Sequence, residues 1–463
     1  MFYYFLKLFI KVTLSFYLKQ IKVRNPERIP GAGPVIFAIN HPNNLLDTLI
    51  VAGHFKPRIY FLGTGALFRN GLAKAFLLRA GIIPVYRPED SDEYKGKNKE
   101  TFQACYDALD QKKMLGIYPE GTTHADWQVK KIKTGAARIL LEAEKRNNYE
   151  AGVKLIPIGL NFSSRKKFRT SVIVSVGEPL ATQPYFAGYD SGDFTAVEQL
   201  TADLQAAMEA EVKHLSEASF QEFVGKLDFF YREDAINSLT AGKQIEKTEI
   251  DKLRLSKKLI EGVEYYAKKQ PEVINSVWDK IEAYHQKLKK VHLRDQQIRR
   301  DVDKNITPLR YLRIGFTGLL GLPIFIYGLI NNYIPNFFPA RLSQWIANKE
   351  TDIATIRVVS GILAFPLFYV LQSYLIYFLF GTVIALAYFI SLPFSGLFVL
   401  SFRKFYKRYI ENVRLGFLLL KHRSFVDRLK SQRAAIITEI NTLSEDYLFL
   451  KKKQSKTTEI MPI

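Results

Sequence analysis

A histidine and an aspartate six residues apart, His41 and Asp47, are the pair in this sequence whose types and spacing best suit acid–base chemistry. An imidazole that is oriented by a carboxylate can take a proton from a hydroxyl near neutral pH. A lone His and a lone Asp at this separation also occur often by chance. The pair therefore predicts a general base only if the neighbouring chain builds a site around it.

The local pattern places His41 at a corner between a strand and a helix. Residues 34–39 form an apolar run that is typical of a short buried strand. Pro42 can open a helix, because the first helical turn does not need the N–H that proline lacks. Asp47 would then lie on this helix, from which its carboxylate can turn back to orient the imidazole.

Three further apolar runs deliver polar residues or glycine at their ends, in Gly81–Arg87, Tyr118–His124 and Leu155–Phe162. Helical stretches separate these runs. Strands that alternate with helices predict an α/β domain with a mostly parallel sheet covered on both faces. The motifs should then meet at one edge of the sheet, where open α/β folds place their ligands.

Together, the four blocks resemble the four motifs of the phospholipid and glycerol acyltransferase family (PlsC-like). The family usually has four residues between His and Asp, whereas five separate His41 from Asp47. This longer form, with Gly159–Phe162 and Val176–Pro179, resembles the glycerol-3-phosphate/dihydroxyacetone-phosphate acyltransferase branch. The resemblance covers residues 20–185.

The resemblance implies a membrane O-acyltransferase of phospholipid biosynthesis in which His41 and Asp47 are catalytic. A fatty acyl group would move from acyl-CoA or acyl carrier protein to glycerol-3-phosphate or 1-acylglycerol-3-phosphate. The acyl donor would be a co-substrate, and neither a cofactor nor a metal is expected. The sequence lacks a Gly-x-Ser-x-Gly elbow, a His-Glu-x-x-His motif and paired cysteines, which disfavours serine and zinc hydrolases.

Binding of a phosphorylated acceptor is the role predicted for residues of the second, third and fourth blocks. The Glu-Gly-Thr turn can present amides and a hydroxyl to a phosphate, although it could simply be a turn that needs glycine. Many family members carry Arg after this turn, where Thr123 and His124 stand here. Basic residues nearby could substitute, or could be solvated surface charges. The predicted substrate-binding residues are Arg87, Glu120, Gly121, Thr122, Lys133 and Arg169.

The composition points to an anionic partner. Lys and Arg outnumber Asp and Glu by 66 to 45, which gives a net charge of +21. Nucleic acid, anionic lipid and phosphorylated small molecules would all fit this charge. Long apolar segments favour a phospholipid membrane and argue against a nucleic-acid partner. The single cysteine, Cys105, rules out an internal disulfide and is best explained as a core residue.

Two apolar stretches predict a part embedded in the membrane. Residues 314–334 are long enough to cross about 30 Å of hydrocarbon. Residues 358–402 contain no charged residue and are about twice the length of one crossing, so we expect two helices that turn near Gly381. We expect two to three spans, with residues 314–334 a candidate for a re-entrant segment. Basic flanking residues predict an integral membrane protein whose catalytic domain faces the cytosol.

The sequence therefore divides into five predicted parts. They are an interfacial membrane helix at 1–20, the acyltransferase domain at 21–195, a helical region at 196–310, the transmembrane region at 311–402 and a basic cytosolic tail at 403–463. The first could instead be an ordinary amphipathic helix packed on the domain. A non-catalytic membrane protein that uses the fold to bind or shape lipid is the alternative function. A binding module does not need the His41–Asp47 pair, which favours the enzyme.

Overall fold

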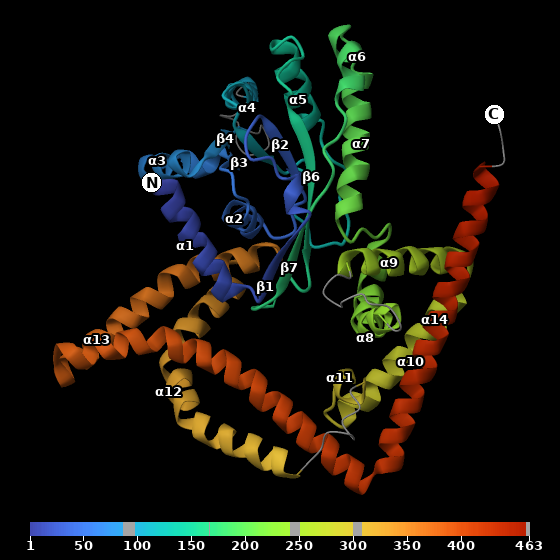
Figure 1. The fold of residues 1–463 in the computed structure, drawn as a ribbon. Coiled ribbons are helices and arrows are strands. Elements are labelled where there is room, and N and C mark those ends of the chain that lie inside the picture. Colours follow the sequence, from blue (N-terminus) through green and yellow to red (C-terminus); the bar gives the residue numbers. More distant parts are fainter. Residues whose placement is uncertain (87–97, 166, 241–250, 300–307, 460–463) are drawn as a thin grey trace. The chain divides into compact units, whose positions relative to one another are not determined.

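The computed structural model describes residues 1–86, 98–165, 167–240, 251–299 and 308–459 (Figure 1). They divide into two compact units. We call Met1–His214 with Pro339–Ile362 the sheet unit, and Leu215–Phe338 with Leu363–Ile463 the helical unit.

The sheet unit is built on one seven-stranded sheet in the order β1-β7-β6-β2-β5-β3-β4. Neighbouring strands are parallel except β6 and β7, which are antiparallel. The predicted α/β fold with a mostly parallel sheet is therefore confirmed. The strands are β1 (Gln20–Arg24), β2 (Val35–Ile39), β3 (Ile59–Thr64), β4 (Ile82–Val85), β5 (Met114–Ile117), β6 (Lys154–Phe162) and β7 (Ser171–Val176).

Helices cover both faces of this sheet. Alternate residues of β2 enter two separate apolar cores: Val35, Phe37 and Ile39 enter one, and Ile36 and Ala38 enter the other. A parallel strand covered on both faces reads as a continuous apolar run for this reason. The helices of the unit are α1 (Phe2–Tyr17), α2 (Leu45–His54), α3 (Gly71–Ala80), α4 (Asn98–Asp110), α5 (Gly135–Arg146), α6 (Phe186–Asp190) and α7 (Thr195–Glu211).

The sheet unit extends beyond the boundary predicted at residue 195. Its first continuous part reaches His214 because α7 packs on β6 and α5. Leu200, Leu204 and Met208 recur at helical spacing along α7 and are completely buried. The first helix of the predicted helical region therefore belongs to the sheet unit.

The first helix, α1, has one buried and one exposed apolar face. Leu14 and Tyr17 are buried in the core that also contains Leu46 of α2. Phe5 and Leu8, near the start of α1, are exposed. The helix is thus packed on the domain along one side, where Phe2 also meets Phe76 of α3, and the interfacial role predicted for residues 1–20 remains a prediction.

The helical unit contains α8 (Gln221–Thr240), α9 (Lys252–Lys269), α10 (Pro271–Lys290), α11 (Asp295–Arg299) and α14 (Arg423–Glu459). α14 occupies most of the segment predicted as a basic tail, and it packs against α9, α10 and α11. Arg433 of α14 is buried between two carboxylates, with Nε 2.7 Å from Asp295 Oδ1 and Nη2 2.6 Å from Asp234 Oδ2. These ion pairs fasten the C-terminal helix to the preceding ones.

The two apolar stretches form α12 (Pro308–Ile346) and α13 (Asp352–Lys421). α13 is broken at Gly381, whose φ of 81° and ψ of 178° are not helical, so the turn predicted there is confirmed (Figure 1). α12 is helical throughout residues 314–334, through Pro323 as well, so the structure shows no turn in the stretch that was a candidate for a re-entrant segment. The side chain of Asn332 in α12 contacts α13 before and after the break at Gly381. It lies 2.5 Å from Tyr369 OH and 3.2 Å from Ser395 Oγ.

Both apolar helices are long and apolar enough to cross a membrane. In each helix, only 11% of the most apolar 18-residue stretch is buried within the described structure. The core helix of a soluble protein would bury such a stretch, because burial of apolar side chains is what stabilises a soluble core. The exposed apolar surface therefore indicates association with a membrane.

Candidate active site

The corner that carries His41 lies at the carboxyl end of β2, in the middle of the sheet. α2 does not begin at Pro42, as the sequence predicts, but at Leu45. The chain first turns through Asn43 and Asn44, and Asn44 takes a φ of 51°. Asn44 combines this positive φ with a ψ of −133°, and asparagine takes a positive φ more readily than most residues. The later start still leaves Asp47 in the first turn of α2.

The structure brings His41 and Asp47 together. His41 Nδ1 lies 2.9 Å from Asp47 Oδ2, and the backbone N–H of Asn43 donates to the same oxygen at 2.7 Å. Asp47 is fully buried, and this burial raises the pKa of its carboxyl group while the bonds from His41 and Asn43 act against that rise. A carboxylate accepting from Nδ1–H leaves Nε2 as the basic nitrogen of the ring.

Tyr118 fixes the plane of the imidazole. Its ring stacks on that of His41 with centroids 3.8 Å apart and an interplanar angle of 16°. Its hydroxyl lies 2.7 Å from Thr48 Oγ1. Burial and the nearby charge of Asp47 raise the pKa of the Tyr118 phenol well above its usual value, so the ring is neutral. Tyr118 is a site residue that the sequence analysis quoted only as part of a motif.

Glu120 ties the third motif to the His41 corner. Its Oε1 accepts from the backbone N–H of His41 at 3.0 Å. Its Oε2 accepts from the backbone N–H of Lys130 at 2.8 Å and lies 2.5 Å from His124 Nε2. Glu120 is 3% exposed. The substrate-binding role predicted for Glu120 stays a prediction, and both oxygens already accept hydrogen bonds from the protein.

The turn after Glu120 needs glycine because Gly121 has a φ of +68°, where any other side chain is strained. A Cβ at this position would lie 2.9 Å from Lys133 Cε, the flexible end of a side chain that can move aside. The N–H of Gly121 donates to Tyr118 O at 3.0 Å, which uses one of the amides predicted to meet a phosphate. Thr122 is exposed beside this turn. The structure thus gathers Gly121, Thr122 and Lys133 in one place, next to Glu120.

Arg169 and Arg87 are not brought to the histidine by any described contact. Arg169 Nη1 donates to Ser15 O at 2.7 Å and to Phe16 O at 3.1 Å, so it holds the end of α1. Arg87 lies outside the described residues. The acceptor-binding roles predicted for both arginines remain predictions.

Arg165 is a basic residue near the pair that the sequence analysis did not select. It lines a small cavity together with Asn40 and Pro42, the residues that precede and follow His41 in the sequence. Its charge is close enough to lower the pKa of Asp47. Burial lowers the pKa of the Arg165 guanidinium, against the effect of Glu350, Asp126 and Asp47. Its position just after the end of β6 was the signal that could have identified it.

Residues 20–161, which include His41, Asp47 and Glu120, match a family model described as Acyltransferase. Residues 20–161 form an acyltransferase domain. This match ends at Asn161 in β6, whereas the sheet unit around the acyltransferase domain also includes β7, α7 and residues 339–362. Arg165 therefore lies outside the matched span.

Two yeast proteins are similar to this chain over more than the acyltransferase domain. Glycerol-3-phosphate O-acyltransferase 2 of Saccharomyces cerevisiae is 25% identical over 307 residues, which cover 60% of this chain and 38% of the yeast protein. Glycerol-3-phosphate O-acyltransferase 1 of the same yeast is 24% identical over 293 residues, or 59% of this chain and 37% of the yeast protein. The chain thus spans less than two fifths of the length of these relatives.

A solved structure was also matched, the 1-acyl-sn-glycerophosphate (LPA) acyltransferase PlsC from Thermotoga maritima. The match covers 43% of this chain and 80% of PlsC, with 16% identity and a TM-score of 0.32.

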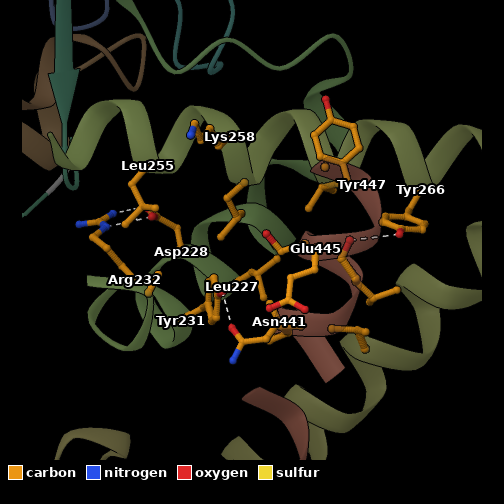
Figure 2. Close-up of a pocket in the computed structure, with 18 of the residues that line it drawn as sticks. Leu227, Asp228, Tyr231, Arg232, Leu255, Lys258, Tyr266, Asn441, Glu445 and Tyr447 are labelled. Carbon is orange, nitrogen blue, oxygen red and sulfur yellow. Dashed lines mark hydrogen bonds and ion pairs between the residues drawn. The ribbon is translucent and has the colours of Figure 1, made fainter. Parts of the chain in front are cut away.

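The helical unit has a cavity of its own, of about 320 Å³, lined by α8, α9, α10 and α14 (Figure 2). Four of its polar side chains are paired with one another: Tyr231 OH donates to Asn441 Oδ1 at 2.6 Å, and Arg232 Nε donates to Asp228 Oδ1 at 2.9 Å. Tyr266 OH donates to Leu443 O at 3.1 Å. This pairing contrasts with the His41 corner, where a basic ring nitrogen is left for chemistry.

Proposed function

We propose that this chain transfers a fatty acyl group from acyl-CoA or acyl carrier protein to a phosphorylated glycerol, either glycerol-3-phosphate or 1-acylglycerol-3-phosphate. The observation that carries the proposal is the 2.9 Å contact between His41 Nδ1 and Asp47 Oδ2 inside the acyltransferase domain. The names of the two yeast relatives support glycerol-3-phosphate as an acceptor.

The geometry of the pair fits direct attack by the acceptor. Nε2 of His41 takes the proton of the acceptor hydroxyl as its oxygen attacks the thioester carbonyl. The new C–O ester bond forms, the C–S bond breaks, and the proton passes from His41 to the departing thiolate. Asp47 stabilises the imidazolium between the two proton transfers. No acyl-enzyme intermediate is needed.

A non-catalytic lipid-binding protein fits this corner less well. Asp47 is fully buried, and its Oδ1 has no hydrogen-bond partner among the described residues. Burial of a carboxylate that is only partly satisfied costs free energy of folding. A protein that only binds lipid gains nothing from this cost, whereas a general base needs the oriented imidazole that the carboxylate provides.

The direct test is an assay of the purified full chain with both donors and a panel of acceptors. The panel contains glycerol-3-phosphate, dihydroxyacetone phosphate, 1-acylglycerol-3-phosphate, glycerol and diacylglycerol, with products identified by mass. We expect acyl esters of the phosphorylated acceptors. Absence of transfer to every acceptor would refute the enzymatic proposal, and a preference for glycerol or diacylglycerol would refute the phosphorylated acceptor.

The acceptor phosphate is proposed to be bound by basic residues around the pair. Arg165 is our candidate, because it lines a cavity with Asn40 and Pro42 and its charge lowers the pKa of Asp47. An arginine can hold two phosphate oxygens in a planar fork, whereas lysine offers a point charge. Arg165→Lys should therefore raise the KM of the acceptor or lower its kcat/KM about 10- to 150-fold, which corresponds to roughly 1.5–3 kcal/mol for a charge-assisted contact. The KM of the acyl donor should change little.

Arg169→Lys is the matched comparison for this prediction. Both substitutions keep the charge, but the guanidinium of Arg169 is bonded to two carbonyls of α1. Steady-state kinetics with each substrate varied in turn would measure the effect. Acceptor kinetics of Arg165→Lys that equal the wild type would remove Arg165 from the phosphate site and return the role to Arg87, Lys133 and Arg169.

The chain is proposed to be an integral membrane protein whose catalytic domain faces the cytosol. Apolar burial, not charge, should hold it, so the full chain should stay in the membrane pellet after alkaline carbonate washing and after a high-salt wash. Immunoblotting of pellet and supernatant measures this. Release by carbonate would mean that α12 and α13 do not cross the bilayer.

A further inference from the structure

The end of α12, the loop that follows it and the first turns of α13 belong to the sheet unit, although they are remote from its other residues in sequence. Pro339–Ile362 clusters with Met1–His214. Ala354 and Val358 are 2% and 3% exposed and enter the apolar core that contains Leu46 of α2, and Ile362 packs against the same core. Their spacing of four residues places them on one face of the first turns of α13.

Polar side chains on these turns complete the N-terminus of α2. Asn44, the N-cap residue of α2, makes no capping bond with its own side chain. Thr355 Oγ1 accepts from the backbone N–H of Leu46 at 3.3 Å, an N–H that also reaches Asn43 O at 3.2 Å. Asn44 Nδ2 donates to Asp352 Oδ1 at 2.9 Å. A helix start needs partners for its free N–H groups, and here one comes from α13.

Thr355 is connected to the catalytic pair through one residue, Asn43. Its hydroxyl donates to Asn43 O at 3.0 Å. The N–H of Asn43 donates to Asp47 Oδ2, the oxygen that contacts His41. Displacement of the Asn43 backbone would therefore move a donor away from the carboxylate that orients the imidazole.

The same segment also touches the third motif. Thr351 Oγ1 lies 3.1 Å from Thr123 Oγ1, in the turn that follows Glu120. The negative charge of Glu350 raises the pKa of the Arg165 guanidinium. Residues from 350 to 355 thus reach three parts of the candidate site that come from separate strands.

We propose that Thr355 and Asp352 are positioning residues for His41 and Asp47, an inference that rests on the proposed acyl transfer. They act from the first turn of an apolar helix and hold the loop between β2 and α2 in the geometry that the general base needs. The span matched to the acyltransferase family, residues 20–161, is then incomplete as a catalytic site without residues 350–355.

The first test compares Thr355→Val, which keeps the shape of the side chain and removes its hydroxyl, with Thr355→Ser, which keeps the hydroxyl. Small misplacements of catalytic groups can cost about 100-fold in rate. Thr355→Val should lower kcat about 10- to 100-fold with little change in the KM of either substrate, and Thr355→Ser should retain most of the wild-type kcat. Ser360→Ala is the matched control, because its hydroxyl bonds only to Ile356 O of the same helix among the contacts described.

Folding of the variants can be followed through Cys105, which is buried and whose thiol has a pKa raised to about 12 by that burial. It should stay unreactive to a thiol reagent while the sheet unit is folded. If Thr355→Val exposes Cys105, Asp352→Ala replaces it as the test, with the same expected fall in kcat. A folded Thr355→Val enzyme with wild-type kcat, or a Thr355→Ser enzyme as impaired as Thr355→Val, overturns the inference.

A second test detects the contact between Asn44 and Asp352 without an activity assay. In the full chain, Asn44→Cys with Asp352→Cys should be joined by a short bifunctional thiol reagent, while Asn44→Cys with Ser360→Cys should not, because position 360 lies about 12 Å further along the helix. Failure of the first pair to react overturns the inference. A wild-type chain that is inactive with every acceptor, although the first pair reacts, refutes the proposed function and the positioning role with it. An active wild type with an unimpaired Thr355→Val refutes the positioning role alone.

Discussion

His41→Ala should lower the turnover number about 10²- to 10⁴-fold, the usual contribution of a positioned general base. The acceptor hydroxyl is a weak nucleophile until its proton is removed, and Nε2 of His41 is the basic nitrogen that the structure leaves for this step. The alanine variant keeps Asp47, Glu120 and the backbone of the loop. Its effect should therefore fall on kcat and much less on the binding of either substrate.

The measurement is the rate of ester formation with saturating substrates, together with the reactivity of Cys105 as a check of folding. His54→Ala is the matched control: His54 lies on α2, and its Nδ1 is 3.0 Å from Ile50 O in the same helix. It should leave turnover unchanged. A folded His41→Ala protein with near wild-type turnover would rule out His41 as the base.

Asp47→Asn should also lower turnover, by about 10²- to 10⁴-fold, without change in the size of the side chain. A neutral amide does not stabilise the imidazolium, and an amide N–H facing Nδ1 favours the tautomer whose Nε2 carries the proton. Two donors, from His41 and the backbone of Asn43, also converge on Asp47 Oδ2. An amide nitrogen at that position would leave the N–H of Asn43 without an acceptor and would make Nδ1 of His41 an acceptor.

The pH dependence of the wild type follows from the same carboxylate. Burial raises the pKa of Asp47 above the ordinary value of an aspartate, so its ionised form is lost at a higher pH than for an exposed one. Turnover should therefore fall as the pH decreases through that raised pKa. Asp110→Asn removes an exposed carboxylate of the sheet unit and should leave rate and pH profile unchanged.

An unaffected Asp47→Asn enzyme would mean that the fifth intervening residue has uncoupled the pair.

Local sequence patterns determined the strands, helices and turns that surround the site. The continuous apolar run of β2 required cover on both faces of the sheet, and the structure provides it with two separate cores. Glycine at position 381, within an uncharged stretch too long for one crossing, predicted the break of α13. The separation of His41 and Asp47 brought both to one corner, although the helix starts at Leu45 and not at Pro42.

Tertiary structure alone decided which distant polar groups contact the His41 loop and the start of α2. Glu120 was predicted to bind substrate, but its carboxylate is bonded to the backbone of His41, 79 residues away. Thr355 reaches the start of α2 across 309 residues. Periodicity reports which side chains are buried and where the backbone turns, because both depend on neighbours along the chain. It carries no information on which distant hydroxyl or carboxylate will meet an unpaired N–H, since that depends on how the helices pack once the sheet has formed.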